Sequence, residues 1–266
     1  MTINDVKQIK LGGIPQYDTY LVDVWGVIYD GHKLIASGIK LLDELMKYGE
    51  VILLSNTSRT ATELTHMLES KGMDTSDLSG VITSGTLAQK EIKAFIKQND
   101  SSSFYHIGSI EPSKWLHELP AKMSDNIDTS DIVICSNLLT DTEEKLIQLT
   151  NQIKEKSLPV FITNPDKKVF ISGEIHMSAG VMTDYCESND IKVSVYGKPE
   201  TSIFLHAIES IGAKKQTTCM VGDSLNTDIL GANQCGIDSI LVQSNSSISQ
   251  TEPLTDKNQP TYRVFL

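Results

Sequence analysis

Apolar segments of strand length alternate with amphipathic segments of helix length along nearly the whole chain, and this alternation constrains the fold most strongly. In the first part of the chain we expect buried strands at residues 20–24, 51–55 and 80–84. Apolar residues at helical spacing predict helices near 39–46 and 60–71, each closed by a glycine. Strands that alternate with helices favour a parallel sheet with helical crossovers. The expected fold class is therefore α/β, with a doubly wound, Rossmann-like sheet.

The same alternation continues to the end of the chain. The middle part predicts helices at 87–97 and from Thr140, where Glu143 completes the spacing of a capping box, and strands at 104–107, 132–135 and 160–163. The last part predicts strands at 193–196, 218–221 and 239–242, and helices from Pro199 and over 227–233. The middle part therefore has the pattern of an insertion into the sheet. We expect the domain segments 1–86, 87–183 and 184–266, with an irregular surface segment at 244–260.

The composition restricts the partners of the protein. Of 266 residues, 34 are Asp or Glu and 23 are Lys or Arg, which gives a formal net charge of -11. Because nucleic acids and anionic membranes attract basic surfaces, neither is expected to be the main partner. The sequence contains neither an apolar stretch of bilayer-spanning length nor a signal-peptide pattern. The four cysteines are scattered without a CxxC pair, which favours reduced thiols and a cytoplasmic location.

Four short polar stretches follow predicted strands, where the ligands of open parallel sheets gather. They are Asp23 in LVDVWGV, Ser55 in LLSNTSR, Lys198 in VYGKPE, and Asp223 with Asp228 in MVGDSLNTDI. Taken singly, each has an ordinary explanation: a turn or helix cap for the aspartates, an N-cap for the serine and a solvated loop for the lysine. Their order and spacing along one chain argue against chance.

With these motifs the sequence resembles the haloacid dehalogenase-like (HAD) hydrolases, and more narrowly their class IIA branch of NagD-like phosphatases. The resemblance covers nearly the whole chain. SNTSR matches the second motif of the family, GKP its lysine motif and GDSLNTDI its acidic fourth motif. Residues Thr163 to Asp166, TNPD, are similar to a signature of the class IIA cap, in which Asp166 could face the substrate or end a turn. The resemblance identifies the inserted segment as an α/β cap and the two flanking segments as the core.

The resemblance implies a phosphoryl-transfer role for each motif. Asp23 would attack phosphorus and form an aspartyl-phosphate, which divides one difficult displacement into two easier ones. Lys198 would offset the negative charge that gathers around the phosphoryl group. Ser55, together with the backbone amides of Asn56 and Thr57 near a helix start, would bind the phosphate oxygens.

A Mg²⁺ site is also implied by the resemblance. Its protein ligands would be Asp23, the backbone carbonyl of Trp25 and Asp223, with water and substrate phosphate completing an octahedral shell of oxygen atoms. Asp228 would lie behind these ligands and orient a metal-bound water or Lys198.

The first motif departs from the family pattern, which is Asp-x-Asp-Gly. This chain has Asp23-Val24-Trp25-Gly26, so the second carboxylate, which serves as the general acid and base, is replaced by an indole. An indole has one weakly acidic N–H and cannot act as a general acid or base at neutral pH. Trp25 could be a packing residue of a weakened site, or Asp30 or His32 could supply the missing acid.

These observations predict a Mg²⁺-dependent phosphatase of small phosphorylated metabolites, in which the cap sets the specificity. The alternative is a catalytically weak phosphoester-binding or regulatory protein that keeps the pocket. A third and less favoured hypothesis is phosphotransfer through the same aspartyl intermediate. Fold resemblance does not decide among them. The sequence names neither the substrate nor the oligomeric state, and a homodimer is possible.

Overall fold

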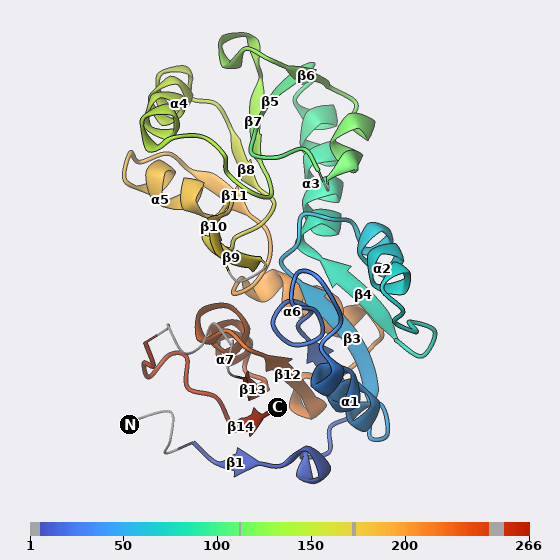
Figure 1. The fold of residues 1–266 in the computed structure, drawn as a ribbon. Coiled ribbons are helices and arrows are strands. Elements are labelled where there is room, and N and C mark those ends of the chain that lie inside the picture. Colours follow the sequence, from blue (N-terminus) through green and yellow to red (C-terminus); the bar gives the residue numbers. More distant parts are fainter. Residues whose placement is uncertain (1–5, 112, 172–173, 245–252) are drawn as a thin grey trace. The chain divides into compact units, whose positions relative to one another are not determined.

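A computed structural model gives the fold of residues 6–111, 113–171, 174–244 and 253–266 (Figure 1). The chain divides into two compact units. The described residues of 1–55, 64–82 and 198–266 form the first unit, and those of 56–63 and 83–197 form the second. The predicted cap, 87–183, lies within the second unit, which also takes in the separate segment 56–63 and extends to Gly197. Within the described part of the chain, no helix combines the length and the apolarity needed to cross a membrane.

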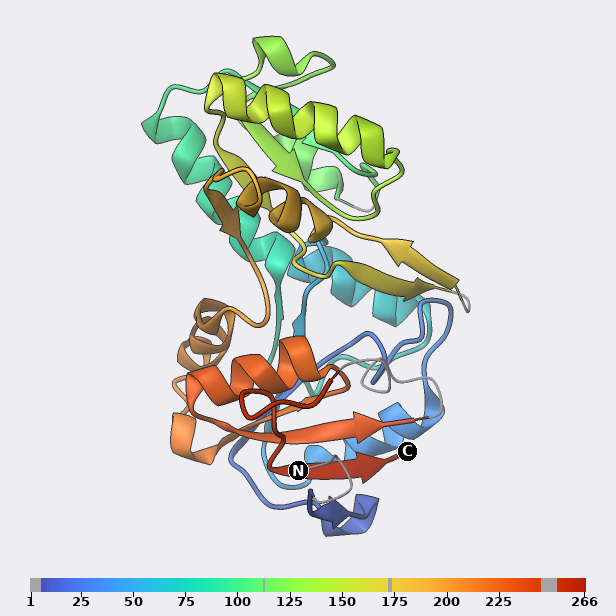
Figure 2. The same cartoon turned by 90° about the vertical axis from the view of Figure 1, so that its left-hand side faces the viewer.

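The first unit is built on a sheet whose strand order reverses in its middle. Seven strands of described residues form it, in the spatial order β1 (Gln8–Ile9), β14 (Tyr262–Phe265), β13 (Asp238–Gln243), β12 (Thr218–Gly222), β2 (Thr19–Val22), β3 (Glu50–Ser55) and β4 (Gly80–Thr83). β2 pairs in parallel with both β3 and β12. Figure 2 shows β13 and β14, the orange-red and red strands, running side by side in one direction. The chain proceeds outward from β2 to β4 and later, in the opposite direction, from β12 to β14. The predicted doubly wound α/β class is confirmed.

The helices of the first unit bury apolar faces against this sheet. They are α1 (Ala36–Leu45), most of α2 (Ala61–Ser70), α6 (Thr201–Ser210) and α7 (Leu230–Cys235), with 3-10 turns at Leu11–Gly13 and Lys215–Thr217 and a π-helical turn, η6, at Leu225–Ile229. In α1, Leu41 and Leu45 lie on the inner face, in one apolar cluster with Tyr20 and Val22 of β2. This packing fixes the strand that ends immediately before Asp23.

The second unit has its own parallel sheet, in the order β11 (Val193–Val195), β8 (Val160–Ile162), β7 (Ile132–Cys135), β5 (Ser103–Ile107) and β6 (Lys122–Ser124). Its other elements are α3 (Ser84–Gln98), α4 (Glu143–Lys156), α5 (Val181–Glu187), the antiparallel hairpin of β9 (Lys168–Ile171) and β10 (Glu174–Met177), and 3-10 turns at Lys114–Glu118 and Ile127–Thr129. Ile132 and Ile134 of β7 join an apolar cluster with α3, whereas Val133 and Cys135 join one with α4. Successive side chains of β7 thus face opposite layers, so both faces of the sheet are covered.

Some elements differ from the sequence-based expectation. The capping box expected from Thr140 and Glu143 is wrong, because the side chain of Thr142 accepts the hydrogen bond from the Lys145 N–H and α4 begins at Glu143. The helix expected over 227–233 is divided between the π-helical turn η6 and α7. The irregular segment expected at 244–260 lies partly outside the described residues, and β14 follows it at Tyr262.

Candidate functional site

Two aspartates lie at the point where the strand order of the first unit reverses. Asp23 directly follows β2 and Asp223 directly follows β12, and these strands are neighbours with Val22 paired to Val221. The backbone N–H of Asp23 donates to the carbonyl oxygen of Val221 at 2.8 Å, which extends the pairing to the aspartate itself. Ligands of doubly wound sheets bind outside the carboxyl ends of the strands at this reversal. The topology therefore places both carboxylates where a ligand site is expected.

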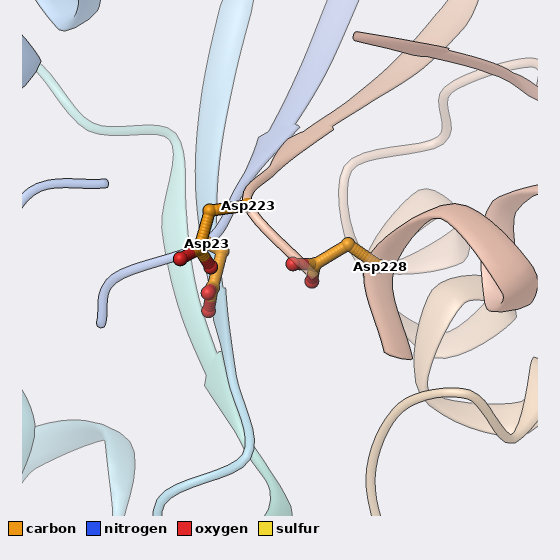
Figure 3. A group of neighbouring side chains, drawn as sticks. All are labelled: Asp23, Asp223 and Asp228. Atoms are coloured by element: carbon orange, nitrogen blue, oxygen red, sulfur yellow. The ribbon is translucent and has the colours of Figure 1, made fainter. Parts of the chain in front are cut away.

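A third carboxylate, from Asp228, completes a compact acidic group (Figure 3). One oxygen from each of Asp23, Asp223 and Asp228 lies within 4.8 Å of the others. All three side chains are buried, and Asp228 has no exposed surface. Buried like charges are unfavourable unless a cation compensates them, so this group requires positive charge close by.

Lys198 supplies part of that charge. Its Nζ atom lies 2.7 Å from Oδ1 of Asp23 and 2.6 Å from Oδ1 of Asp228, and it donates to the carbonyl oxygen of Leu54 at 3.0 Å. Burial alone would lower the pKa of Lys198, but the charges of Asp228 and Asp23 outweigh it and raise the pKa above its usual range. The lysine is therefore a fixed cation between two carboxylates.

The charge balance of the group remains negative. Three carboxylates against one ammonium leave a formal charge of two negative units. Burial, followed by the charge of Asp228, raises the pKa of Asp23 to about 7, although Lys198 opposes the rise. Carboxylate oxygens are the preferred ligands of hard divalent cations such as Mg²⁺, and the donor set fits such an ion.

Two glycines allow the carboxylates to approach the backbone. Gly26 has a φ of +83°, and a Cβ atom there would lie 2.2 Å from Oδ2 of Asp223. A Cβ atom on Gly222 would lie 2.2 Å from Cγ of Asp228. Any side chain at either position would displace an acidic residue of the site.

The turn after β12 fixes Asp228. Its Oδ2 accepts a hydrogen bond from the backbone N–H of Ser224 at 3.1 Å, and the Ser224 side chain caps the π-helical turn by accepting from the Thr227 N–H. Asp228 lies within this π-helical turn, and such turns are frequent at functional sites. Sequence analysis did not single out Ser224, although a serine three residues before Thr227 is a helix-capping pattern that could have indicated it.

Trp25 contributes an aromatic contact to this region. Its ring packs edge-on against Tyr29, with 5.6 Å between the ring centroids, and borders the apolar core of the first unit. The Gly26 N–H donates to the Tyr29 carbonyl at 2.9 Å and closes the loop around the aromatic pair. The half-buried indole therefore packs in the loop that follows the first motif.

Asp30 is engaged in its own loop. Its Oδ1 accepts hydrogen bonds from the backbone N–H groups of His32 and Lys33, both at 2.8 Å. Burial acts to raise the pKa of Asp30, but the donors at Lys33 and His32 outweigh it and hold the pKa below its usual value. A carboxyl group with a lowered pKa is a poor proton donor near neutral pH.

The predicted phosphate-binding residues are divided between the two units. Ser55 is the buried last residue of β3 and follows Leu54, whose carbonyl binds Lys198. Asn56 and Thr57 belong to the second unit, where Nδ2 of Asn56 donates to Asp166 at 2.8 Å. In that unit the carbonyl of Thr57 accepts from the Gly85 N–H at 3.0 Å.

Two family models match separate parts of the chain. The model described as haloacid dehalogenase-like hydrolase matches residues 20–121, which contain Asp23 and Ser55. The model described as HAD-hydrolase-like matches residues 195–265, which contain Lys198, Asp223 and Asp228.

Similar proteins cover almost the same length. Over 254 residues the chain is 29% identical to the acid sugar phosphatase of Staphylococcus aureus (strain USA300), covering 93% of this chain and 94% of that protein. The crystal structure of a haloacid dehalogenase-like hydrolase from Brucella suis 1330 matches with a TM-score of 0.81 and 21% identity, over 94% of this chain and 98% of that one. The glycerol phosphate phosphatase of Mycobacterium tuberculosis, solved in complex with magnesium, matches with a TM-score of 0.69 and 19% identity, over 96% and 76%.

Proposed function

Because the chain belongs to the haloacid dehalogenase-like hydrolases, we propose that it is a Mg²⁺-dependent phosphatase of small phosphorylated metabolites. The name of the Staphylococcus aureus relative, an acid sugar phosphatase, supports the phosphatase activity. The magnesium bound to the Mycobacterium tuberculosis protein, together with the acidic group around Asp23, supports the metal.

The observation that carries the proposal is the placement of Lys198 between Asp23 and Asp228. A buried ammonium 2.7 Å from Asp23 is suited to neutralise charge as a phosphoryl group approaches the same carboxylate. Phosphoryl transfer depends mainly on such positioning and charge compensation. An oxygen of Asp23 attacks phosphorus while the bond to the ester oxygen breaks, which gives an aspartyl-phosphate and an alkoxide. Water then cleaves the new phosphorus–oxygen bond, releasing phosphate and restoring the carboxylate.

We infer that Asp23, Asp223 and the backbone carbonyl of Trp25 would hold Mg²⁺. A backbone carbonyl is available whatever the side chain, so the tryptophan does not remove a ligand. When bound, the ion would offset the charge of the phosphate and orient one of its oxygens. Asp228 pairs with Lys198 and accepts a hydrogen bond from the Ser224 N–H, so it would orient the lysine without binding the metal itself.

The phosphate itself would be bound by Ser55 and by the backbone amides of Asn56 and Thr57. A hydroxyl and two amide groups before α2 form a suitable set of donors for phosphate oxygens. Lys198 completes the set with its positive charge.

Proton transfer to the leaving group is the weak step. Trp25 cannot supply the proton, and Asp30 is held as a carboxylate by its own loop, so that His32 is the remaining candidate of the two acids expected from the sequence. Aryl and acyl phosphates have stable leaving groups and need little protonation, so we propose them as the better substrates. The same observation favours the alternative function, a phosphoester-binding protein with little turnover.

A panel of alkyl, aryl and acyl phosphates, assayed with Mg²⁺, separates the two functions. General acid catalysis contributes roughly 10²–10⁴-fold, and we expect alkyl esters to be slower than aryl esters by about that factor. Asp23→Asn should abolish turnover of every ester while the protein stays folded. A wild-type protein that binds Mg²⁺ and inorganic phosphate but hydrolyses no ester would replace the phosphatase proposal with the binding-protein alternative.

A further inference from the structure

Asp166 has a defined contact within the second unit. Its Oδ1 accepts a hydrogen bond from Nδ2 of Asn56 at 2.8 Å. Its backbone N–H donates to the Oδ1 of Asn164 at 2.9 Å, so the turn that follows β8 determines where the carboxylate lies. Asp166 and Asn56 are 110 residues apart in the sequence, yet both belong to the second unit. The contact joins the TNPD signature to the segment proposed to bind phosphate.

The carboxamide of Asn56 is held at both of its polar atoms. Nδ2 donates to Asp166, and Oδ1 accepts from the Ser84 hydroxyl at 3.5 Å. A carboxylate can only accept and a hydroxyl can donate, so these partners select one orientation of the amide. Asn56 is 5% exposed, and hydrogen bonds are stronger in such a buried environment.

Gly197 passes directly against this amide. Its φ is +124°, and a Cβ atom there would lie 2.6 Å from Oδ1 of Asn56 and 2.3 Å from the Ser84 hydroxyl. Gly197 is the residue before Lys198, and Asn56 is the residue after Ser55. The side-chain carboxamide of Asn56 therefore lies against the backbone of Gly197, directly before the lysine motif. It also fixes the backbone that follows β3.

We propose that Asp166 is a positioning residue for phosphate binding. Its carboxylate holds Asn56, and through Asn56 the backbone that presents the amides of Asn56 and Thr57. This inference rests on the proposed function, because it takes those amides as phosphate ligands. A residue that acts in this way affects the phosphoryl group common to every substrate. A residue that contacts the rest of the substrate would instead affect each leaving group differently.

Inorganic phosphate is the appropriate probe, because it has no leaving group. Its binding to the full chain is measured by titration calorimetry in the presence of Mg²⁺. We expect Asp166→Ala to weaken phosphate binding about tenfold, the effect of one hydrogen bond to a charged group. Asp166→Asn keeps an oxygen that can accept from Asn56 and should lose less. For aryl and alkyl phosphates alike, KM should rise by the same factor while kcat changes little.

A double-mutant cycle tests whether Asp166 acts through Asn56. In the Asn56→Ala background, Asp166→Ala should cause no further loss of phosphate binding, because the partner is already absent. Asp184→Ala is the matched control: this exposed aspartate of the same unit pairs with Lys167 at 2.6 Å, and its removal should leave phosphate binding unchanged. Thermal unfolding is recorded for each variant. If Asp166→Ala does not fold, Asp166→Ser replaces it in the cycle, because it keeps a polar group in the turn.

The outcomes separate the two proposals. Additive losses in the cycle, or losses that differ between leaving groups, would overturn the positioning role. Normal phosphate binding by Asp166→Ala would overturn it as well and leave the proposed function standing. A wild-type protein that does not bind phosphate with Mg²⁺ would overturn both.

Discussion

At the scale of single residues, Lys198 supplies the positive charge that partly compensates the buried carboxylates of the candidate site. Removing its ammonium leaves the buried carboxylates of Asp23 and Asp228 without their shared cation. Breaking a buried ion pair by removing one partner costs about 3–5 kcal/mol, and we expect Lys198→Ala to lower the free energy of unfolding by that amount without Mg²⁺. Urea denaturation measures the loss. Turnover of phosphate esters should be abolished in the same variant.

The control for this prediction is a lysine in an exposed ion pair. Lys167 pairs with Asp184 at 2.6 Å, and both side chains are more than half exposed. Lys167→Ala should change the free energy of unfolding by less than about 1 kcal/mol. Equal losses in the two variants would contradict the assignment of Lys198 as the buried cation of the site.

The absence of a carboxyl group at position 25, where the chain has Trp25, should limit proton transfer in the proposed reaction. Trp25→Asp introduces a carboxyl group two residues after the nucleophile, and we expect hydrolysis of alkyl phosphates to rise by roughly 10²-fold or more. Aryl phosphates should gain less, because their leaving groups need no proton. Initial rates with both ester types, at saturating Mg²⁺, measure the difference.

Two further measurements accompany this variant. Loss of the edge-on contact with Tyr29 costs about 1 kcal/mol or more, so the unfolding midpoint must be recorded. Trp25→Phe is the matched control, since it keeps an aromatic ring without adding a carboxyl group. Faster alkyl phosphate hydrolysis by Trp25→Phe would show that ring size, not proton transfer, limits the wild type.

The acidic residues of the site could be predicted from the sequence, whereas the backbone groups that support them could not. Asp23 and Asp223 follow apolar runs of strand length, and that local pattern also predicted the neighbouring strands correctly. The Leu54 carbonyl and the Ser224 N–H are groups that every residue type carries. Their hydrogen bonds depend on tertiary placement and leave no signature in the sequence.

At the scale of secondary-structure elements, prediction succeeded where the sequence pattern of an element alone determines it, and failed where the element depends on a neighbouring strand. β3 and α1 are long and strongly patterned, and the structure has them within a few residues of the expected bounds. The two-residue edge strand β1, its neighbour β14, and the hairpin of β9 and β10 were not predicted. Short strands of this kind form only because a neighbour supplies hydrogen bonds, as β13 does for β14.

Asp131 joins the start of β5 to the start of β7 and should make the second unit sensitive to acid. Its Oδ2 accepts from the backbone N–H groups of Ser102 and Ser103 at 2.7 and 2.9 Å. The donor at Ser102 is the main cause that lowers the pKa of Asp131. A carboxyl whose folded pKa is lowered stabilises the fold at pH values above its unfolded pKa. That contribution disappears as the pH falls through the folded pKa.

We therefore expect Asp131→Asn to destabilise the protein near neutral pH by about 1 kcal/mol, a small value because the carboxylate is exposed. The difference from wild type should vanish in acid, below the lowered pKa. Urea denaturation of both proteins across this pH range measures the trend, with the exposed Asp125→Asn as control. A difference that stays constant down to the acid limit would contradict the role of the ionised carboxylate.

At the scale of the whole molecule, the proposed metal site would link metal binding to folding. An ion that binds only the folded protein stabilises it by mass action, about 2.7 kcal/mol at a concentration one hundred times Kd. Mg²⁺ should therefore raise the unfolding temperature, and Asp223→Ala should remove the rise. Differential scanning calorimetry with and without millimolar Mg²⁺ measures the shift. Asp184→Ala should keep it, and a wild-type protein that shows no shift would contradict the proposed metal site.

The segment 56–63 limits how this protein can be recombined with its relatives. It belongs to the second unit, where the Ser58 carbonyl accepts from Trp115 at 2.8 Å and from Ser113 at 3.2 Å, although the chain reaches it from the first unit. If only residues 83–197 were grafted into a relative, Trp115 and Ser113 would have to donate to the backbone of that relative in place of the Ser58 carbonyl. A graft that also carries 56–63 would bring Asn56 and Thr57 with it. The second graft therefore transfers part of the proposed phosphate-binding segment together with the cap. For these two reasons, we do not expect that exchanging the cap between relatives would exchange substrate preference alone.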